Sequence, residues 1–219
     1  MTLSPVARIA AFLVALIAVA GLAIQVTVSL EKTGAVPAAL WSMLRFFTII
    51  GNGVTALVLL GAALGLRWPS RPAVLGGVTL IMGLIGVVYA TLLRNTEHLV
   101  GHAQIANYLM HYAMPAAIAP FWLLLVPKGG LTRIDPLNWA LLPLAYFPYA
   151  LVRAHLDGKY PYPFINVAQL GWAHVLTTAA IITMAFLLTG LAMVWLDRML
   201  GRSRKAKAPV EAAAMASEA

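Results

Sequence analysis

An apolar run without a single charged side chain lies between Arg71 and Arg94. It reads PAVLGGVTLIMGLIGVVYATLL (Pro72–Leu93) and is 22 residues long. About 20 apolar residues in a helix are enough to cross the ~30 Å hydrocarbon core of a bilayer. In lipid, a single apolar segment satisfies its own backbone hydrogen bonds only as a helix. The run therefore predicts a transmembrane helix.

Five further apolar runs flank this one, so the sequence predicts an all-α, polytopic membrane protein built as a bundle of six transmembrane helices. Composition favours the same class, because 62% of the 219 residues are hydrophobic and only 10% are charged, whereas about 25% are charged in soluble domains. The first run is too long for the apolar part of a signal peptide, so we expect it to be retained. The six predicted spans are Pro5–Leu30, Ala39–Leu66, Pro72–Leu93, Ala103–Val126, Leu137–Val152 and Asn166–Trp195.

The lysines and arginines are unevenly divided between the two ends of the predicted spans. Ten lie at the end that holds both termini, four lie at the opposite end, and Arg45 falls inside the second span. Because cytoplasmic loops carry the excess of Lys and Arg, both termini are predicted to be cytoplasmic. Residues 1–200 form the predicted membrane domain, and residues 201–219 form a basic, then Ala-rich tail that we expect to be disordered.

Five of the ten Lys and Arg residues on the predicted cytoplasmic side follow the last predicted span. These five residues are Arg198, Arg202, Arg204, Lys205 and Lys207. A basic run just beyond a membrane helix contacts anionic lipid, so the net charge of +8 indicates a lipid surface and no nucleic acid. The chain has no cysteine, which excludes disulfides, thiol nucleophiles and thiolate metal sites. It also lacks a Gly-rich phosphate loop and a metal-ligand cluster of convincing spacing, so no metal or other cofactor is predicted.

Strongly polar side chains inside three predicted spans are the candidates for a functional site, because such residues are costly in lipid. In the second and fourth spans they recur at helical spacing and so share one face. The residues of the second span are Arg45, Thr48, Asn52 and Thr55, and those of the fourth are Gln104, His111 and either Tyr108 or Asn107. The residues of the sixth span are Asn166, Gln169, His174, Thr177 and Thr178. Thr48, His111 and His174 each lie about eight residues, or ~12 Å, from the outer end of their predicted spans. Three polar side chains at one depth predict a polar pocket that opens to the outer side.

Each of these residues also has an interpretation without a function. A Thr in a membrane helix commonly bonds the carbonyl one turn back, a lone His can link two helices, and Arg45 can extend to the interface. His98 and His102 lie four residues apart beside Glu97 and could mimic a metal pair. A solvated outer loop is the favoured interpretation of that segment, and the same ambiguity applies to His155.

Three motifs along the chain resemble one known family in the same order. The segment LRFFTIIGN (Leu44–Asn52) contains Phe-Thr-x-x-x-Asn, MHYAMP (Met110–Pro115) contains His-x-x-x-Pro, and HLDGKYPYPF (His155–Phe164) contains Gly-x-x-x-Tyr-Pro-Phe. They are similar to motifs of the androgen-induced and androgen-dependent membrane hydrolases, which cleave fatty acid esters of hydroxy fatty acids, and of their bacterial six-span relatives. The spacing after His111 is one residue shorter than in the eukaryotic members.

The resemblance implies an intramembrane threonine hydrolase, here in a bacterial cytoplasmic membrane, whose substrate is a lipid ester. Matched by position, Thr48 is the nucleophile and His111 is the base that removes its proton. A hydroxyl needs such a base, and neutral imidazole is the usual one. The residues expected to contact substrate or an oxyanion, or to orient the site, are Asn52, Arg45, Tyr162, His155 and His174. No third catalytic member is fixed by the sequence.

Two other functions fit the same polar residues. The first is a non-enzymatic binder or transporter that holds a small amphiphile in the pocket. The second is a membrane haem protein with His111 and His174 as axial ligands. Only the hydrolase requires the side chains of Thr48 and His111 to lie within hydrogen-bond reach, near ~3 Å.

Overall fold

The computed structural model describes residues 3–96 and 99–217, with side chains as far as residue 202. The chain is 82% helical, and the described residues contain no strand. The α-helices are α1 (Pro5–Thr33), α2 (Val36–Met43), α3 (Phe47–Ala63), α4 (Pro72–Val88), α5 (Gly101–Tyr108), α6 (Met114–Leu125), α7 (Asp135–Asp157) and α8 (Val167–Ser217). Two π-helical turns, η1 (Tyr89–Leu93) and η2 (Leu109–Ala113), follow α4 and α5, and a 3₁₀ turn, η3 (Pro163–Ile165), precedes α8.

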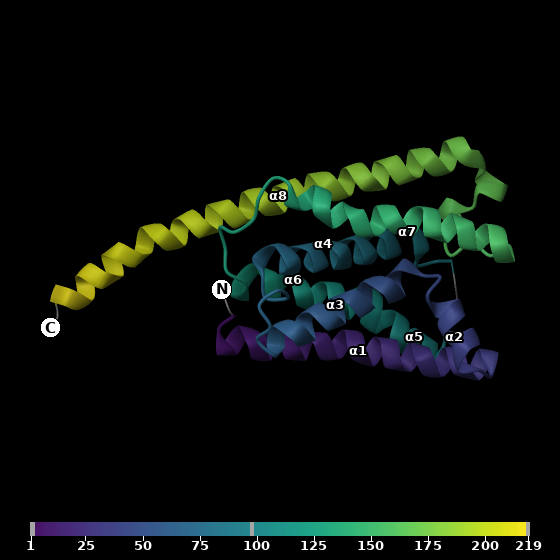
Figure 1. Ribbon diagram of the computed structural model, residues 1–219, viewed down its shortest axis with the longest axis horizontal. Helices are drawn as coiled ribbons and strands as arrows, with labels where there is room; N and C mark the ends of the chain where they lie inside the picture. Colours follow the sequence, from purple (N-terminus) through teal and green to yellow (C-terminus); the bar gives the residue numbers. More distant parts are fainter. Residues whose placement is uncertain (1–2, 97–98, 218–219) are drawn as a thin grey trace.

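The helices are arranged as an elongated bundle with α1 along one side and the α7–α8 pair along the other (Figure 1). α3, α4, α5 and α6 lie between these two sides. The start of α1 and the C-terminal part of α8 lie at the same end of the bundle, whereas α2 and the start of α8 lie at the opposite end. The opposite end is the predicted outer end, and the candidate site residues lie towards it.

α1 shows how the sequence sets both the ends and the packing of a helix. Ser4 caps its N-terminus by accepting a hydrogen bond from the Ala7 amide at 3.2 Å, and Gly34 ends it in the left-handed conformation. One face carries only small buried residues, which are Ala7, Ala11, Ala15, Ala18 and Gly21. Small residues on one helix face let neighbouring backbones approach closely in a membrane. α1 packs against α3, α5 and α6.

Among the described residues, four helical segments are long and apolar enough to cross a membrane: Pro5–Thr33, Pro72–Leu93, Gly101–Leu125 and Val167–Arg202. The bent pair α2 and α3 makes a fifth if it is counted as one span. The multi-pass class is therefore supported by four or five candidate spans. The predicted fifth span, Leu137–Val152, lies in α7, whose Tyr, Trp, Pro and Asn residues lower its hydropathy. Six spans and cytoplasmic termini stay predictions.

The predicted second span, Ala39–Leu66, is not one continuous helix. The chain leaves the helix at Leu44 and resumes it at Phe47, with a bend of 98° between α2 and α3. Arg45 lies in this bend, so the prediction that it shares a helix face with Thr48 is wrong. Thr48 lies in the first turn of α3 and not about two turns inside a long helix. Thr48, Asn52 and Thr55 do share one buried face of α3.

α8 continues through residues 201–217 at the C-terminal end of the bundle (Figure 1). It is kinked near its start, because Gly171 has a positive φ of 75° inside the helix. Only glycine adopts this conformation without strain. The division at residue 200 into a membrane domain and a disordered tail stays a prediction.

Candidate active site

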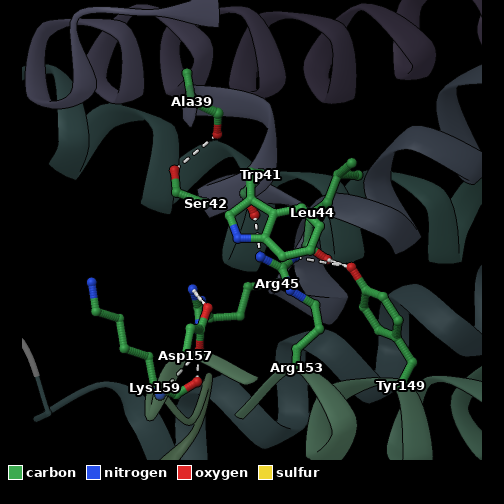
Figure 2. Close-up of polar contacts among 9 residues, drawn as sticks. All are labelled: Ala39, Trp41, Ser42, Leu44, Arg45, Tyr149, Arg153, Asp157 and Lys159. Carbon is green, nitrogen blue, oxygen red and sulfur yellow. Dashed lines mark hydrogen bonds and ion pairs between the residues drawn. The ribbon is translucent and has the colours of Figure 1, made fainter. Parts of the chain in front are cut away.

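The bend between α2 and α3 is held by side chains of α7. Tyr146 donates from its hydroxyl to the Arg45 carbonyl at 2.8 Å, and Tyr149 donates to the Leu44 carbonyl at 2.9 Å. Arg153 donates to the Trp41 carbonyl at 2.6 Å, and its guanidinium lies 3.8 Å from the Trp41 ring centroid (Figure 2). A break in a membrane helix leaves backbone carbonyls unpaired unless neighbouring groups bond them. These three donors therefore stabilise the bend that places Thr48 at the start of α3.

An ion pair lies in the same region, at the C-terminal end of α7. The Arg45 guanidinium donates to both carboxylate oxygens of Asp157, at 2.8 and 2.6 Å, and to the Lys159 carbonyl at 2.6 Å (Figure 2). The Arg45 hydrogen bonds lower the pKa of Asp157 to about 2. Bidentate arginine–carboxylate pairs fix geometry as well as charge. Arg45 thus ties the bend to the end of α7, and its guanidinium is engaged there and not directed at an oxyanion.

Thr48 and His111 are in direct contact. Thr48 Oγ1 lies 3.0 Å from His111 Nε2, although the two residues are 63 positions apart in the chain. Thr48 is the second residue of α3, and only 6% of its surface is exposed. His111 is the middle residue of the π-helical turn η2. α3 and η2 pack against each other and so bring the hydroxyl and the imidazole together.

The other side of the His111 ring fixes its tautomer. His111 Nδ1 lies 3.1 Å from the Asn107 carbonyl oxygen. A carbonyl can only accept, so Nδ1 carries the proton of the neutral imidazole and Nε2 presents its lone pair to Thr48. The Thr48 hydroxyl is therefore the donor in the 3.0 Å contact. This is the arrangement that a general base requires.

Tyr89, the first residue of η1, supports the imidazole from its face. The Tyr89 and His111 rings are stacked, with centroids 4.1 Å apart and planes at 27°. The Tyr89 hydroxyl accepts a hydrogen bond from the Asn107 side-chain amide at 2.6 Å. Asn107 therefore holds Tyr89 with its side chain and His111 with its carbonyl. Sequence reasoning missed Tyr89 altogether and named Asn107 only as the alternative to Tyr108, which is 62% exposed.

Two cavities meet at Thr48 and His111, which line both of them. The larger cavity has a volume of about 660 Å³ and is rich in polar groups, among them those of Lys32, Tyr89, Asn107, Lys159, Tyr162, Asn166 and Gln169. The smaller has a volume of about 150 Å³ and is lined almost entirely by apolar side chains of α3, α4, α7 and α8. The dyad is therefore at the junction of a polar and an apolar compartment.

The remaining predicted site residues divide into those near Thr48 and those away from it. The Tyr162 hydroxyl accepts from the Thr48 amide at 3.4 Å, and burial raises the pKa of Tyr162, so the hydroxyl stays protonated. Asn52 donates to the Thr48 carbonyl at 2.9 Å, inside its own helix, and lines neither cavity. His155 and His174 are exposed and line neither cavity. Tyr162 is thus the predicted auxiliary residue that approaches Thr48 and lines both cavities.

No metal or haem geometry is formed by the histidines that the structure describes. Within residues 3–96 and 99–202 no group of three or more His, Cys, Asp and Glu side chains is arranged to hold a metal ion. Glu97 and His98, part of the pattern that could mimic a metal pair, lie outside the described residues. His111 has both ring nitrogens in hydrogen bonds, and His174 is exposed and lines neither cavity at His111, so the two are not arranged as an axial pair.

Fold and site together define an all-helical protein with several candidate membrane spans and a buried Thr–His pair at a cavity junction. Comparisons with protein-family models, with curated proteins and with solved structures find no match. The likeness to the androgen-induced and androgen-dependent hydrolases therefore rests on the three motifs of the chain itself. Two of them contribute to the contact described here, through Thr48 and His111, and the third contributes Tyr162.

Proposed function

We propose that the protein is an intramembrane hydrolase that cleaves a lipid ester with Thr48 as nucleophile and His111 as general base. The observation that carries the proposal is the 3.0 Å contact between Thr48 Oγ1 and His111 Nε2, with the ring held in the required tautomer by the Asn107 carbonyl. The motif resemblance adds the substrate class, a fatty acid ester of a hydroxy fatty acid or a similar ester. Both residues line a cavity where such an ester can bind.

In the first half of the reaction the acyl group is transferred to the enzyme. Thr48 Oγ1 attacks the ester carbonyl carbon while His111 Nε2 takes the hydroxyl proton. The tetrahedral intermediate then breaks its bond to the alcohol oxygen, which receives that proton from His111 and leaves as the free alcohol. Thr48 now carries the acyl group as an ester, and His111 is neutral again.

In the second half water releases the acid. A water molecule in the polar cavity donates its proton to His111 Nε2 as its oxygen attacks the acyl carbon. The carbon–Oγ1 bond of the acyl-enzyme breaks, and His111 returns the proton to Thr48. The products are one fatty acid and one alcohol, and the dyad is restored. Because the larger cavity is polar and open, water reaches the acyl-enzyme without a second site.

The start of α3 supplies donors for the negative oxygen of the tetrahedral intermediate. Thr48 is the second residue of the helix, so its amide has no partner within the helix and bonds only the Tyr162 hydroxyl. A helix N-terminus also carries partial positive charge. The Thr48 amide and the protonated Tyr162 hydroxyl are therefore the proposed oxyanion donors. Asn52 and Arg45 are assigned to structure, because Asn52 lines neither cavity and the Arg45 guanidinium is paired with Asp157.

For the membrane topology we propose six spans with both termini in the cytoplasm of a bacterial cell. α7 serves as the fifth span, since its 23 residues extend for about 34 Å and it lies beside α8 (Figure 1). An even number of spans agrees with the position of the first and last helix ends at one end of the bundle. The basic segment after residue 197 is then available to anionic lipid at the cytoplasmic surface.

The test is hydrolysis by the purified protein in mild detergent with a panel of lipid esters, including a fatty acid ester of a hydroxy fatty acid. Thr48→Ala and His111→Ala are expected to lose turnover, and Thr177→Ala, at an exposed threonine of α8, is expected to keep it. Helical content and melting temperature of every variant are measured beside activity. If the wild type binds esters without turnover, or the dyad variants remain active, the hydrolase is wrong. Binding without turnover would instead identify a carrier of amphiphiles.

A further inference from the structure

The two cavities at the dyad differ in size, polarity and surroundings. The larger reaches the outer end of the bundle between α1, the α2–α3 bend and the segment before α8. The smaller lies between α4, α7 and α8, deeper along the bundle axis. Only a few residues, among them Thr48, His111 and Tyr162, line both. An ester whose carbonyl carbon is within reach of Thr48 Oγ1 can therefore direct its two halves into different compartments.

Two lysines that form no ion pair with any described residue line the larger cavity. Lys32 and Lys159 line it, and among its described lining residues there is no Asp or Glu. The third cation of the lining, Arg45, is paired with Asp157. The Lys159 backbone is fixed by bonds of its amide to Asp157 and of its carbonyl to Arg45, while its side chain extends away from this pair (Figure 2). No ion pair engages either lysine ammonium within the described part of the chain.

The smaller cavity is suited to a hydrocarbon chain. Apart from the dyad and a few hydroxyl groups, its walls are aliphatic and aromatic, contributed by residues such as Leu84, Val88, Leu144 and Phe147. On the α8 side the wall is formed by Ala179, Ile182 and Thr183. Ala179 is the smallest of these side chains, so the space in front of it sets how much of a chain fits.

We propose that the acyl chain of the substrate binds in the smaller cavity and that the alcohol half, which carries an anionic group, binds in the larger one against Lys159 and Lys32. This inference rests on the proposed function and specifies its substrate orientation. It makes the leaving group a hydroxylated anion that is released towards the outer surface. It also explains the order of events, because departure of the alcohol empties the polar cavity for the hydrolytic water.

The charge half of the proposal is tested with one ester in two forms, the free carboxylate and its methyl ester. Lys159→Ala and Lys32→Ala are each expected to raise KM for the carboxylate by roughly fivefold, and the double variant more, with little change for the methyl ester. Lys159→Arg is expected to restore most of the affinity. Arg67→Ala removes an exposed charge at the other end of α3 and is the matched control. An equal effect on both forms would overturn the assignment of the anionic half.

The chain half is tested by filling the smaller cavity. Ala179→Phe is expected to lower kcat/KM for long acyl chains at least tenfold more than for short ones. Ala180→Phe, at the next residue, which is exposed and lines neither cavity, is expected to leave the ratio unchanged. If Ala179→Phe affects both chain lengths equally, the acyl chain does not occupy this cavity.

A binding measurement separates failure of this inference from failure of the hydrolase. A fluorescent long-chain fatty acid ester with a free carboxylate is titrated into the Thr48→Ala protein, with and without the lysine and Ala179 substitutions. Weaker binding in both sets supports the two-compartment orientation even if the wild type shows no turnover. Turnover that depends on Thr48 but ignores all of these substitutions would overturn the orientation and leave the hydrolase intact.

Discussion

Tyr89 gives the sharpest prediction about how the catalytic imidazole is positioned, because two substitutions separate its two contacts. Tyr89→Phe removes only the hydroxyl that accepts from the Asn107 amide at 2.6 Å. Tyr89→Leu also removes the ring that stacks on His111 at 4.1 Å. Neither substitution alters the Thr48 or His111 side chain, so any loss of activity reports on how His111 is held.

The expected magnitudes follow from these contacts. Asn107 lines the polar cavity, where water can replace the lost hydroxyl, so Tyr89→Phe is expected to cost about 0.5–1.5 kcal/mol. The lost stacking in Tyr89→Leu adds about 0.5–1.5 kcal/mol. If both contributions act on the transition state, kcat/KM falls roughly 2- to 13-fold for Tyr89→Phe and 5- to 150-fold for Tyr89→Leu.

The assay compares kcat/KM for an ester with the rate at which a fluorophosphonate probe labels the protein. Both rates depend on His111 activating Thr48, so they are expected to fall in parallel, with Tyr89→Leu below Tyr89→Phe. Tyr108→Leu, which removes an exposed ring from α5, is the control. A Tyr89→Leu protein that folds normally and labels at the wild-type rate would refute the positioning role of Tyr89.

Three further predictions concern stability and are measured by thermal unfolding in detergent. The Asp157 pKa is lowered by Arg45 to about 2, so the stability that this ion pair contributes is present above about pH 4 and is lost as pH falls towards 2. If the melting temperature of Arg45→Gln depends on pH as that of the wild type does, this prediction is wrong. Gly77→Ala in α4 places a Cβ 2.6 Å from an indole ring of α7 and is expected to destabilise the protein by about 1–3 kcal/mol. The control is Gly83→Ala in the same helix, where the added Cβ meets nothing within 4 Å. Equal melting temperatures for the two variants would contradict the prediction. Thr55→Val removes a buried hydroxyl that has no hydrogen-bond partner among the described residues and is expected to leave stability equal or higher, with activity intact. A clear loss of stability would indicate a partner for that hydroxyl.

The membrane class and the identity of the polar face of α3 could be predicted from local sequence. Apolar runs report burial in lipid directly, and the three- and four-residue spacing of Thr48, Asn52 and Thr55 reports a shared face whatever the helix packs against. Thr48 and His111 could be paired because both motifs fall in predicted helices near the same end of the bundle. The depth estimate used for that pairing assumed a helix start that the structure corrects, since Thr48 lies in the first turn of α3.

The helix break and the support of the imidazole could not be predicted in the same way. The segment around Arg45 reads as a continuous apolar helix, and the groups that stabilise its break lie 101 to 112 residues away, on α7. Such long-range hydrogen bonds leave no periodic signal in sequence. Tyr89 contacts His111 through the packing of two π-helical turns, and π turns have no sequence pattern comparable to helical spacing. Asn107 could have been favoured over Tyr108 by noting that it lies four residues before His111.

The exposed positions of His155 and His174 have a physical cause that sequence reasoning passed over. His174 lies three residues after the kink at Gly171 and is exposed, so depth counted from the helix start did not indicate the direction of its side chain. His155 lies in the last turn of α7, whose inward face there is occupied by Arg153 and Ala154. The depth of a residue along a helix does not determine the direction in which its side chain points. Both of these histidines are exposed and line neither cavity, whatever their depth.

The most direct test of the Thr–His mechanism is to locate the covalent adduct. Wild-type protein is treated with a fluorophosphonate probe, digested and sequenced by mass spectrometry, beside His111→Ala and Thr177→Ala. We predict a single adduct on Thr48 in the wild type and in Thr177→Ala, and loss of that adduct in His111→Ala although Thr48 is still present. An adduct at another residue, or labelling of Thr48 at an undiminished rate without the imidazole, would contradict the assignment of Thr48 and His111 as nucleophile and base.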